Sequence, residues 1–177
     1  DKDPTLKVLV LTGAGERAFC TGMDLKAAAV RIASGGPVSN VVPPYMKTDK
    51  VTIAAVNGYA VAGGLERALA CDIRIASENA QFGSFEIRRG LPNPPDPLIR
   101  LIGFGPALHM LLSGDLIDAQ EALRIGLVTK VVSAQELIPT VEELAARMGE
   151  HPTEVLVATM KAVFAQRPKA KYGESAS

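Results

Sequence analysis

Short apolar runs alternate with helix-like segments along the first half of the chain. Four runs are apolar throughout or alternate apolar and polar positions, which is typical of strands in a largely buried sheet. These runs cover residues 7–12, 51–56, 72–76 and 80–82. Helices are predicted between them, over residues 24–33 and 65–70. Strands and helices in this order, joined by right-handed crossovers, predict an α/β fold.

The second half of the chain has a mainly helical pattern. After Gly90, the run Leu-Pro-Asn-Pro-Pro-Asp-Pro excludes a helix interior and a central strand, because proline lacks the amide hydrogen that both need. Apolar residues at three- and four-residue spacing then predict helices. The predicted helices cover residues 106–113, 119–125, 135–148 and 153–166, and a strand is predicted over 127–132. Because no repeat or linker divides the chain, we expect one domain, with a core over 1–133 and a helical region over 134–177.

The composition excludes several classes of partner. The 177 residues are 47% hydrophobic, and the 19 basic and 19 acidic residues cancel, so no net positive charge favours nucleic acid or an anionic membrane. No apolar run reaches the length of a membrane span, and the first residues lack the apolar segment of a signal peptide. We therefore expect a cytoplasmic protein. Two cysteines and two histidines, none at ligand spacing, predict neither a disulfide framework nor a metal site.

Residues 13–18, Gly-Ala-Gly-Glu-Arg-Ala, fit the glycine pattern of a dinucleotide-binding turn. Such a site needs a helix to begin at once, so that the helix N-terminus can hold the pyrophosphate, and a carboxylate about 20 residues further on. Residues 19–22 intervene before the predicted helix, and residues 34–37 offer no carboxylate. The sequence therefore favours a simple turn.

Two glutamates are candidates for acid–base chemistry. In Ala-Gly-Gly-Leu-Glu, Glu66 shares a helix face with Gly63 at a predicted helix start, where free amides suit a developing oxyanion. Glu86 follows Phe-Gly-Ser-Phe, and apolar neighbours can raise the proton affinity of a carboxylate enough for it to act as an acid. The alternatives are that Glu66 only complements the helix dipole, and that Glu86 is a surface residue paired with an arginine.

A second helix start is predicted after residue 22. Gly22 precedes the presumed N-cap, Asp24, and leaves the Met23 amide at that start. Cys20 has no histidine nearby and is interpreted as a packing residue rather than a nucleophile.

Four segments taken together are more specific than any single motif. They are residues 18–26 (AFCTGMDLK), 53–66 (IAAVNGYAVAGGLE), 70–92 (ACDIRIASENAQFGSFEIRRGLP) and 114–132 (GDLIDAQEALRIGLVTKVV). In their order and spacing they resemble the enoyl-CoA hydratase/isomerase (crotonase) superfamily. The resemblance implies a spiral of ββα units followed by C-terminal helices. It also implies a homotrimer or homohexamer, with those helices at the contacts between subunits.

The resemblance implies a reaction as well. The amides of Met23 and Gly63 would form an oxyanion hole for the carbonyl of an acyl-CoA thioester. Glu66 would help to activate the water that attacks C3, and Glu86 would exchange the proton at C2. The implied enzyme is an enoyl-CoA hydratase, a hydro-lyase that converts a 2-enoyl-CoA to a 3-hydroxyacyl-CoA without a metal or a separate cofactor. Contacts with the substrate and its coenzyme A are expected from Thr21, Gly22, Asp24, Lys26 and Gly64.

The chain departs from the family pattern in two ways. Residues 92–97 are proline-rich where the family usually has a glycine-rich loop. A first strand–helix unit and the last helices are missing, so we expect a fold truncated at both ends. One alternative is an isomerase or a carnitinyl-CoA dehydratase-like enzyme, in which Asp96 or another carboxylate relocates the proton. The other alternative is a catalytically silent acyl-CoA-binding protein.

Overall fold

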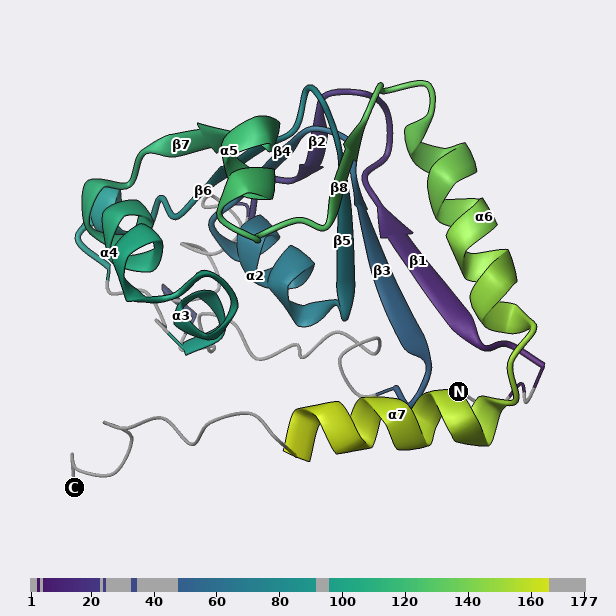
Figure 1. Cartoon of the computed structure of the whole chain (residues 1–177). Helices are drawn as coiled ribbons and strands as arrows, with labels where there is room; N and C mark the ends of the chain where they lie inside the picture. Colours follow the sequence, from purple (N-terminus) through teal and green to yellow (C-terminus); the bar gives the residue numbers. More distant parts are fainter. Residues whose placement is uncertain are drawn as a thin grey trace.

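A computed structural model of the chain describes residues 3, 5–22, 24, 33–34, 48–91 and 96–165. Within these residues the strands form two four-stranded sheets (Figure 1). The first sheet is parallel throughout, in the order β1 (Val8–Thr12), β3 (Val51–Val56), β5 (Ile73–Ser77), β8 (Lys130–Val132). The second sheet has the order β2 (Ala18–Cys20), β4 (Tyr59–Val61), β6 (Gln81–Gly83), β7 (Leu116–Asp118), of which only β7 is antiparallel.

Successive pairs of strands build the two sheets together. The first strand of each pair (β1, β3, β5) joins the first sheet, and the second strand (β2, β4, β6) joins the second sheet. Each new pair lies beside the previous one, and α2 (Gly63–Ala70) follows β4. The chain therefore winds as a spiral of ββα units, which confirms both the predicted α/β class and the spiral that the resemblance implies.

The turn between β3 and β4 holds the glycine-rich turn that precedes β2. The Asn57 Oδ1 accepts a hydrogen bond from the Gly13 amide at 3.1 Å, and Asn57 Nδ2 donates to the Gly15 carbonyl oxygen at 2.7 Å. At Gly58 a Cβ atom would overlap the Arg17 carbonyl oxygen, so glycine is required there. The chain passes from this turn directly into β2, without a helix. The pattern at residues 13–18 is therefore a simple turn, as the sequence favoured.

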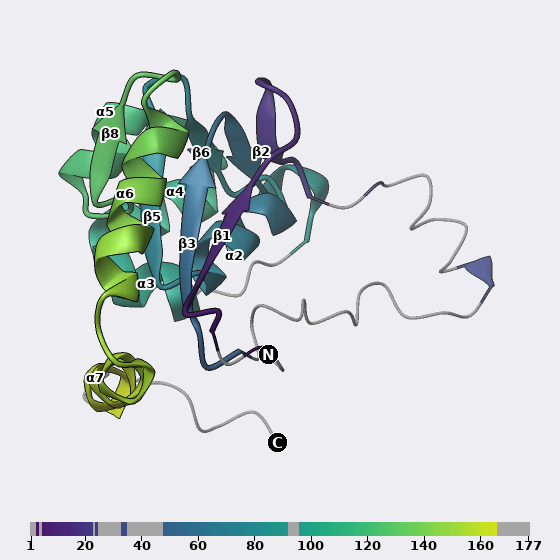
Figure 2. The same ribbon diagram turned by 90° about the vertical axis from the view of Figure 1, so that its right-hand side faces the viewer.

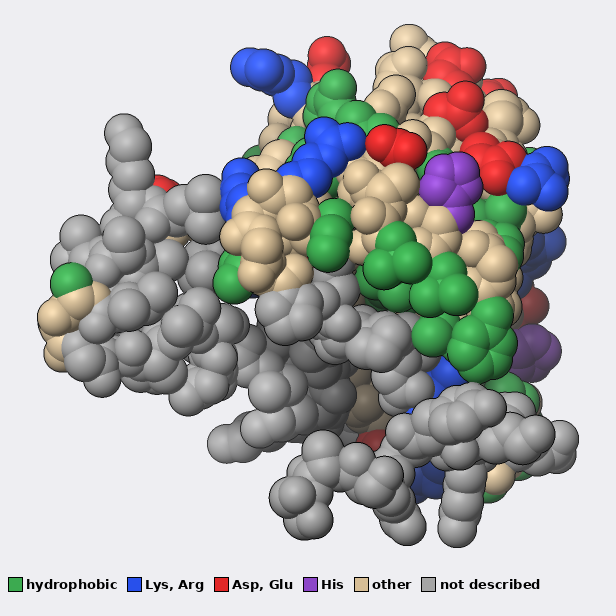
Figure 3. All heavy atoms as spheres, turned by 90° about the vertical axis from the view of Figure 1, so that its left-hand side faces the viewer, with side chains coloured by type: hydrophobic (Ala, Val, Ile, Leu, Met, Phe, Trp, Pro, Cys, Tyr) green, Lys and Arg blue, Asp and Glu red, His purple; other side chains and the backbone are tan. Residues whose placement is uncertain are grey.

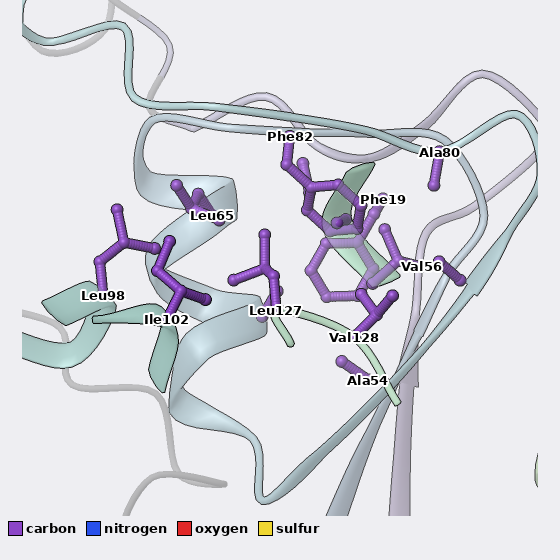
Figure 4. Packing of buried hydrophobic residues seen from close by; sticks show 14 of the residues in the cluster. Phe19, Ala54, Val56, Leu65, Ala80, Phe82, Leu98, Ile102, Leu127 and Val128 are labelled. Carbon is purple, nitrogen blue, oxygen red and sulfur yellow. The ribbon is translucent and has the colours of Figure 1, made fainter. Parts of the chain in front are cut away.

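The helices complete the layers around the sheets. After α2 come the short 3₁₀ helix η2 (Ile87–Arg89), α3 (Asp96–Ile102), α4 (Phe104–Ser113), α5 (Ala119–Arg124), α6 (Leu137–Gly149) and α7 (Thr153–Ala165). The main core lies between the sheets and α2, where Phe82 and Phe19 pack near Val56 and Leu127 (Figure 4). Leu65 of α2 faces α3 in the same cluster.

Helix α6 covers the opposite face of the first sheet (Figure 2). Its buried Leu137 and Val141 pack against Ile53, Ala55 and Ile75. Every residue of β3 is buried because both faces of the sheet are covered, which explains its uninterrupted apolar run. Helix α7 lies across the end of the sheet (Figures 1 and 2). The division at residue 133 and the role of the last helices in subunit contacts stay predictions.

The pattern of apolar and polar residues predicted the longer helices and strands correctly. The predicted strand at 51–56 and the predicted helices in the second half are confirmed to within a few residues. The three-residue strands β2, β4 and β7 and helix α3 were not predicted. Most of the predicted helix at 24–33, the proline run at 92–95 and the tail from 166 lie outside the described residues. None of the described helices has the length and apolar character to cross a bilayer.

A buried arginine joins the end of α2 to the rest of the core. Arg74 of β5 is only 5% exposed. Its guanidinium donates to the carbonyl oxygens of Cys71 at 2.6 Å and Leu127 at 2.8 Å. A cation at a helix C-terminus stabilises the helix dipole, and the hydrogen bonds offset the cost of burying the charge. The alternating pattern of 72–76 predicted a strand here but gave no sign of this role.

Candidate active site

A strained residue marks the start of α2. Ala62, between β4 and α2, has φ 51° and ψ −129°, and it has the only positive φ of the non-glycine residues in the described chain. Its amide donates to the Gly83 carbonyl oxygen at 2.9 Å, which holds the strand end in this conformation. Strain of this kind costs about 1–3 kcal/mol and is concentrated at functional sites. The Gly63 amide comes next and has no acceptor within the helix that it opens.

The loop after β2 meets the start of α2. A Cβ atom on Gly22 would lie 3.2 Å from the Gly63 nitrogen, and Gly22 itself has φ 88°. The two loops meet because β2 and β4 are parallel neighbours, so that their carboxyl ends lie at the same edge of the second sheet. The structure therefore brings the Gly22 and Gly63 segments together, as the resemblance implies. Met23, the other expected amide donor, lies outside the described residues.

The residues expected to contact coenzyme A lie in or near this loop. Thr21 and Asp24 are exposed after β2, and Lys26 lies outside the described residues. Gly64 is buried, and a Cβ atom there would overlap the Cys20 carbonyl oxygen. Gly64 therefore allows α2 to pack tightly against β2. The binding roles expected for these residues stay predictions.

The two candidate glutamates line one small cavity. It has a volume of about 20 Å³ and is lined by Ala62, Leu65, Glu66, Leu69, Ser84, Glu86, Leu98 and Leu111. Space of this size holds about one water molecule. The parallel pairing of β4 with β6, with Val61 opposite Gly83, places the first turn of α2 beside the loop that carries Glu86. Backbone pairing across the sheet thus brings both carboxylates to the same cavity.

Glu66 has an altered affinity for protons. Partial burial raises the pKa of its carboxyl above the ordinary value, and the nearby negative charge of Glu86 raises it further, while Arg67 opposes both effects. The Glu66 side chain as a whole remains exposed. The alternative that Glu66 only complements the helix dipole does not account for its place beside a second carboxylate.

We expect Glu66→Gln to stabilise the fold at pH 7. Because folding raises the pKa of Glu66, the ionised carboxylate is less favourable in the folded than in the unfolded chain, and it lowers the stability of the fold at pH 7. This loss of stability disappears as the pH falls below the pKa that Glu66 has in the unfolded chain. Because the side chain is exposed, the gain is expected to be below about 1 kcal/mol, or less than roughly 2–4 °C in Tm. Thermal melts of wild type and Glu66→Gln between pH 4 and pH 7.5 measure it.

Glu142→Gln, on the exposed face of α6, is the matched control for these melts. The Tm difference between Glu66→Gln and wild type should shrink towards pH 4 and should exceed the difference shown by the control at pH 7. A lower Tm for Glu66→Gln than for wild type at pH 7 would contradict the assigned environment of Glu66.

The expected alternative for Glu86, a surface ion pair with an arginine, is not found among the described residues. Arg88 instead pairs with Asp115 at 3.6 Å and lies over the Phe85 ring, 4.7 Å from its centroid. Glu86 is half-buried and accepts a hydrogen bond from the Ser84 hydroxyl, with 3.4 Å between Oγ and Oε2. The Glu86 carboxylate is therefore not held by an arginine of the described residues and can interact with a molecule in the cavity.

The cysteines show no sign of a nucleophile. Cys71 is buried, and burial raises the pKa of its thiol to about 11, so it stays protonated at neutral pH. Cys20 is half-buried in β2 and packs against the main core, in agreement with its interpretation as a packing residue. Among the described side chains, no group of three or more His, Cys, Asp or Glu residues is placed to hold a metal ion.

A larger cavity lies at the carboxyl ends of the first sheet. Its volume is about 380 Å³, and its lining runs from the turn at Gly13 and Gly15 to the start of α6 at Leu137. It shares no lining residue with the cavity between the glutamates, and Glu16 is the single carboxylate in its lining. Two facing carboxylates are found at the small cavity, which is therefore the candidate active site.

Comparison with known proteins identifies the family. The family model for enoyl-CoA hydratase/isomerase matches residues 1–175. The chain belongs to the enoyl-CoA hydratase/isomerase family. Within this family it is 45% identical over 172 residues to the (E)-benzylidenesuccinyl-CoA hydratase of Thauera aromatica, covering 90% of this chain and 65% of that protein. It is 40% identical over 171 residues to the carnitinyl-CoA dehydratase of Proteus mirabilis, covering 92% of this chain and 64% of that protein.

Solved structures of this family share the fold. The enoyl-CoA hydratase of Mycobacterium tuberculosis matches with a TM-score of 0.81 and 38% identity, over 93% of this chain and 71% of that one. The spiral observed here is thus the crotonase fold. The chain spans slightly less than two thirds of the length of the two curated relatives.

Proposed function

We propose that this member of the enoyl-CoA hydratase/isomerase family is an enoyl-CoA hydratase. The reaction is the syn addition of water to a 2-enoyl-CoA, which gives a 3-hydroxyacyl-CoA. The observation that carries the proposal is that Glu66 and Glu86 line one cavity of about 20 Å³, large enough for one water molecule, beside the start of α2. Addition of water across a double bond needs a group that takes a proton and a group that gives one, both close to the same water.

The start of α2 would stabilise the charge that develops on the substrate. In the proposed complex the thioester oxygen accepts hydrogen bonds from the amides of Gly63 and Met23. The free amide and the positive end of the helix dipole favour the enolate over the neutral thioester, and this difference lowers the barrier. The closeness of Gly22 to the Gly63 nitrogen, which would lie 3.2 Å from a Cβ atom added at Gly22, supports the pairing of the two loops at one oxygen atom.

The glutamates would then exchange protons with water and substrate. Glu66, as its carboxylate, takes a proton from the water as the water oxygen bonds to C3. The electron pair of the C2–C3 double bond moves to the thioester as an enolate, and Glu86, which takes up a proton by exchange with solvent for this step, gives that proton to C2. The raised pKa of Glu66 supports this role, because it makes the carboxylate a stronger base than an ordinary glutamate. Water is consumed, and the acid–base groups regain their starting states by proton exchange.

The rest of the substrate would contact residues that the resemblance to the family indicates. Thr21, Gly22, Asp24, Lys26 and Gly64 are proposed to line the path of the acyl-CoA. The apolar residues of the cavity come from α2, α3 and α4 and would face the acyl group (Figure 4 shows Leu65 and Leu98). The proposed reaction uses side chains and amides of the protein, and the coenzyme A belongs to the substrate.

The second candidate is the reverse reaction, the dehydration of a 3-hydroxyacyl-CoA. The similarity to a carnitinyl-CoA dehydratase favours it, and the same two carboxylates would carry it out. An isomerase would instead move a proton between carbons without adding water, and an inert acyl-CoA-binding protein would do neither. Asp96, considered as a proton carrier for the isomerase, begins α3.

The proposal is tested with crotonyl-CoA, a simple 2-enoyl thioester. Hydration removes the absorbance of the conjugated double bond, and mass spectrometry should show the addition of one water. Proton NMR of the product separates a 3-hydroxyacyl-CoA from a shifted double bond. Binding of crotonyl-CoA by calorimetry without any change in absorbance or mass would identify an inert binding protein and exclude the hydratase.

We also propose that the protein assembles as a homotrimer or homohexamer. On α4, Phe104, Leu108 and Leu112 are 60%, 44% and 67% exposed and form one stripe, and Figure 3 shows hydrophobic side chains gathered on this side of the molecule. A patch of this kind supports a contact with another chain. Sedimentation equilibrium of wild type measures the assembly, and a monomer at micromolar concentration would exclude it. Localisation in the cytoplasm stays a prediction of the sequence.

A further inference from the structure

A buried serine contacts one of the two candidate catalytic carboxylates. Ser84 is 4% exposed, and its side chain lines the cavity between Glu66 and Glu86. Its hydroxyl donates to Glu86 Oε2 at 3.4 Å. Of the other buried polar side chains of the described chain, Thr52 bonds to Asp72 and Arg74 bonds to backbone carbonyls, while Ser77 has no hydrogen-bond partner among the described residues. Ser84 therefore differs from them, because its hydroxyl points towards a reacting group.

The backbone around Ser84 is firmly held. The preceding Gly83 pairs with Val61 in the second sheet and accepts the Ala62 amide at 2.9 Å. The Phe85 ring then covers Gly83, because a Cβ atom at that glycine would lie 2.9 Å from the ring. Ser84 is thus fixed relative to the start of α2, whereas Glu86 has a longer side chain with more freedom to rotate. A hydrogen bond from a fixed hydroxyl can restrict that rotation.

We propose that Ser84 is a positioning residue for Glu86, an inference that rests on the proposed hydratase function. A serine hydroxyl donates one hydrogen bond and accepts up to two. By donating to Oε2, Ser84 leaves the other carboxylate oxygen of Glu86 free to face C2 of the substrate. The hydroxyl can at the same time accept a hydrogen bond from the water in the cavity. The separation of 3.4 Å is long for such a bond, and catalytic hydrogen bonds commonly shorten when substrate binds.

The kinetic test is a double-mutant cycle with Ser84→Ala and Glu86→Gln. If Ser84 acts through Glu86, Ser84→Ala should lower kcat for crotonyl-CoA by about 10-fold with KM within about 2-fold of wild type, since an acid that is poorly oriented is slower but binding is retained. In the Glu86→Gln background, Ser84→Ala should change kcat by less than about 2-fold. An equal loss of activity in both backgrounds, or no loss in either, would overturn the proposal.

Ser77→Ala is the matched control. Ser77 is also buried and lies in the lining of the larger cavity, and its hydroxyl has no hydrogen-bond partner among the described residues. We expect kcat of Ser77→Ala within about 2-fold of wild type. Thermal melts of Ser84→Ala and Ser77→Ala show whether either substitution acts through loss of the fold.

Crystal structures of wild type and Ser84→Ala test the positioning independently of activity. We expect the Glu86 carboxylate to contact the Ser84 hydroxyl in the wild type and to rotate or become disordered in the variant. An unchanged carboxylate in Ser84→Ala would overturn the positioning role even if the enzyme is a hydratase. Absence of hydration by the wild type would overturn the proposed function, and the two crystal structures would still decide whether Ser84 orients Glu86.

Discussion

Glu66→Gln and Glu86→Gln are each expected to hydrate crotonyl-CoA at least about 100-fold more slowly than wild type. Glutamine keeps the size and shape of glutamate but neither takes nor gives a proton at neutral pH. Because both carboxylates line a cavity for one water, replacing either of them leaves one half of the proton transfer without a partner. Absorbance of crotonyl-CoA at saturating substrate gives kcat for each variant, and the substrate dependence gives KM.

The loss should appear mainly in kcat, since binding of the thioester depends on the start of α2 and the loop after β2. The double variant should be less impaired than the product of the single effects, because residues that act on one water act as a unit. Glu142→Gln on α6 should have wild-type activity. Activity of either cavity variant within about 3-fold of wild type would exclude its carboxylate from the chemistry.

Stability and activity should respond to Glu66→Gln in opposite directions. The raised pKa of Glu66 means that the folded protein holds a carboxylate in a place that disfavours its charge. The substitution is expected to raise the melting temperature slightly at pH 7 while it removes most of the activity. This combination is difficult to explain for a glutamate that only supports the fold, because loss of a helix-dipole partner would lower both.

Longer elements of the fold could be predicted because their patterns are local. The apolar run of β3 is six residues long and buried on both faces, so its pattern is unambiguous. The strands β2, β4 and β7 contain three residues each, too few for any periodicity to appear. Helix α3 was missed because prolines precede it, although Pro97 lies in its first turn, where proline is tolerated.

The candidate site could be predicted from the sequence only through the resemblance. Taken alone, the residues around Glu66 and Glu86 left open a dipole partner and a surface ion pair. Parallel pairing of β4 with β6 brings the two glutamates to one cavity, and pairing between distant strands leaves no local signal in the sequence. The strained backbone of Ala62 gave no signal either, since alanine is unusual at positive φ. Ser84 could have been predicted as a partner of Glu86, because it is a hydroxyl-bearing residue two positions before that candidate acid.

Gly64→Ala is expected to destabilise the fold by at least about 3 kcal/mol, which corresponds to a fall in Tm of roughly 6–12 °C or to insoluble protein. A Cβ atom at this position would overlap the Cys20 carbonyl oxygen, and Cys20 belongs to the neighbouring strand β2. Backbone in a paired strand cannot move aside as a flexible side chain can, so either β2 or the first turn of α2 must shift. Circular dichroism melts of the purified variant measure the effect.

Gly105→Ala provides the matched control, because Gly105 also lies near the start of a helix, α4, and a Cβ atom there meets no other atom within 4 Å. Alanine is the better helix former by about 1 kcal/mol, so this variant should be as stable as wild type or slightly more stable. A Tm of Gly64→Ala within about 2 °C of wild type would show that α2 does not pack closely on β2. The amide of Gly63 would then lack the rigid support that an oxyanion hole requires, since the position of that amide depends on the same contact.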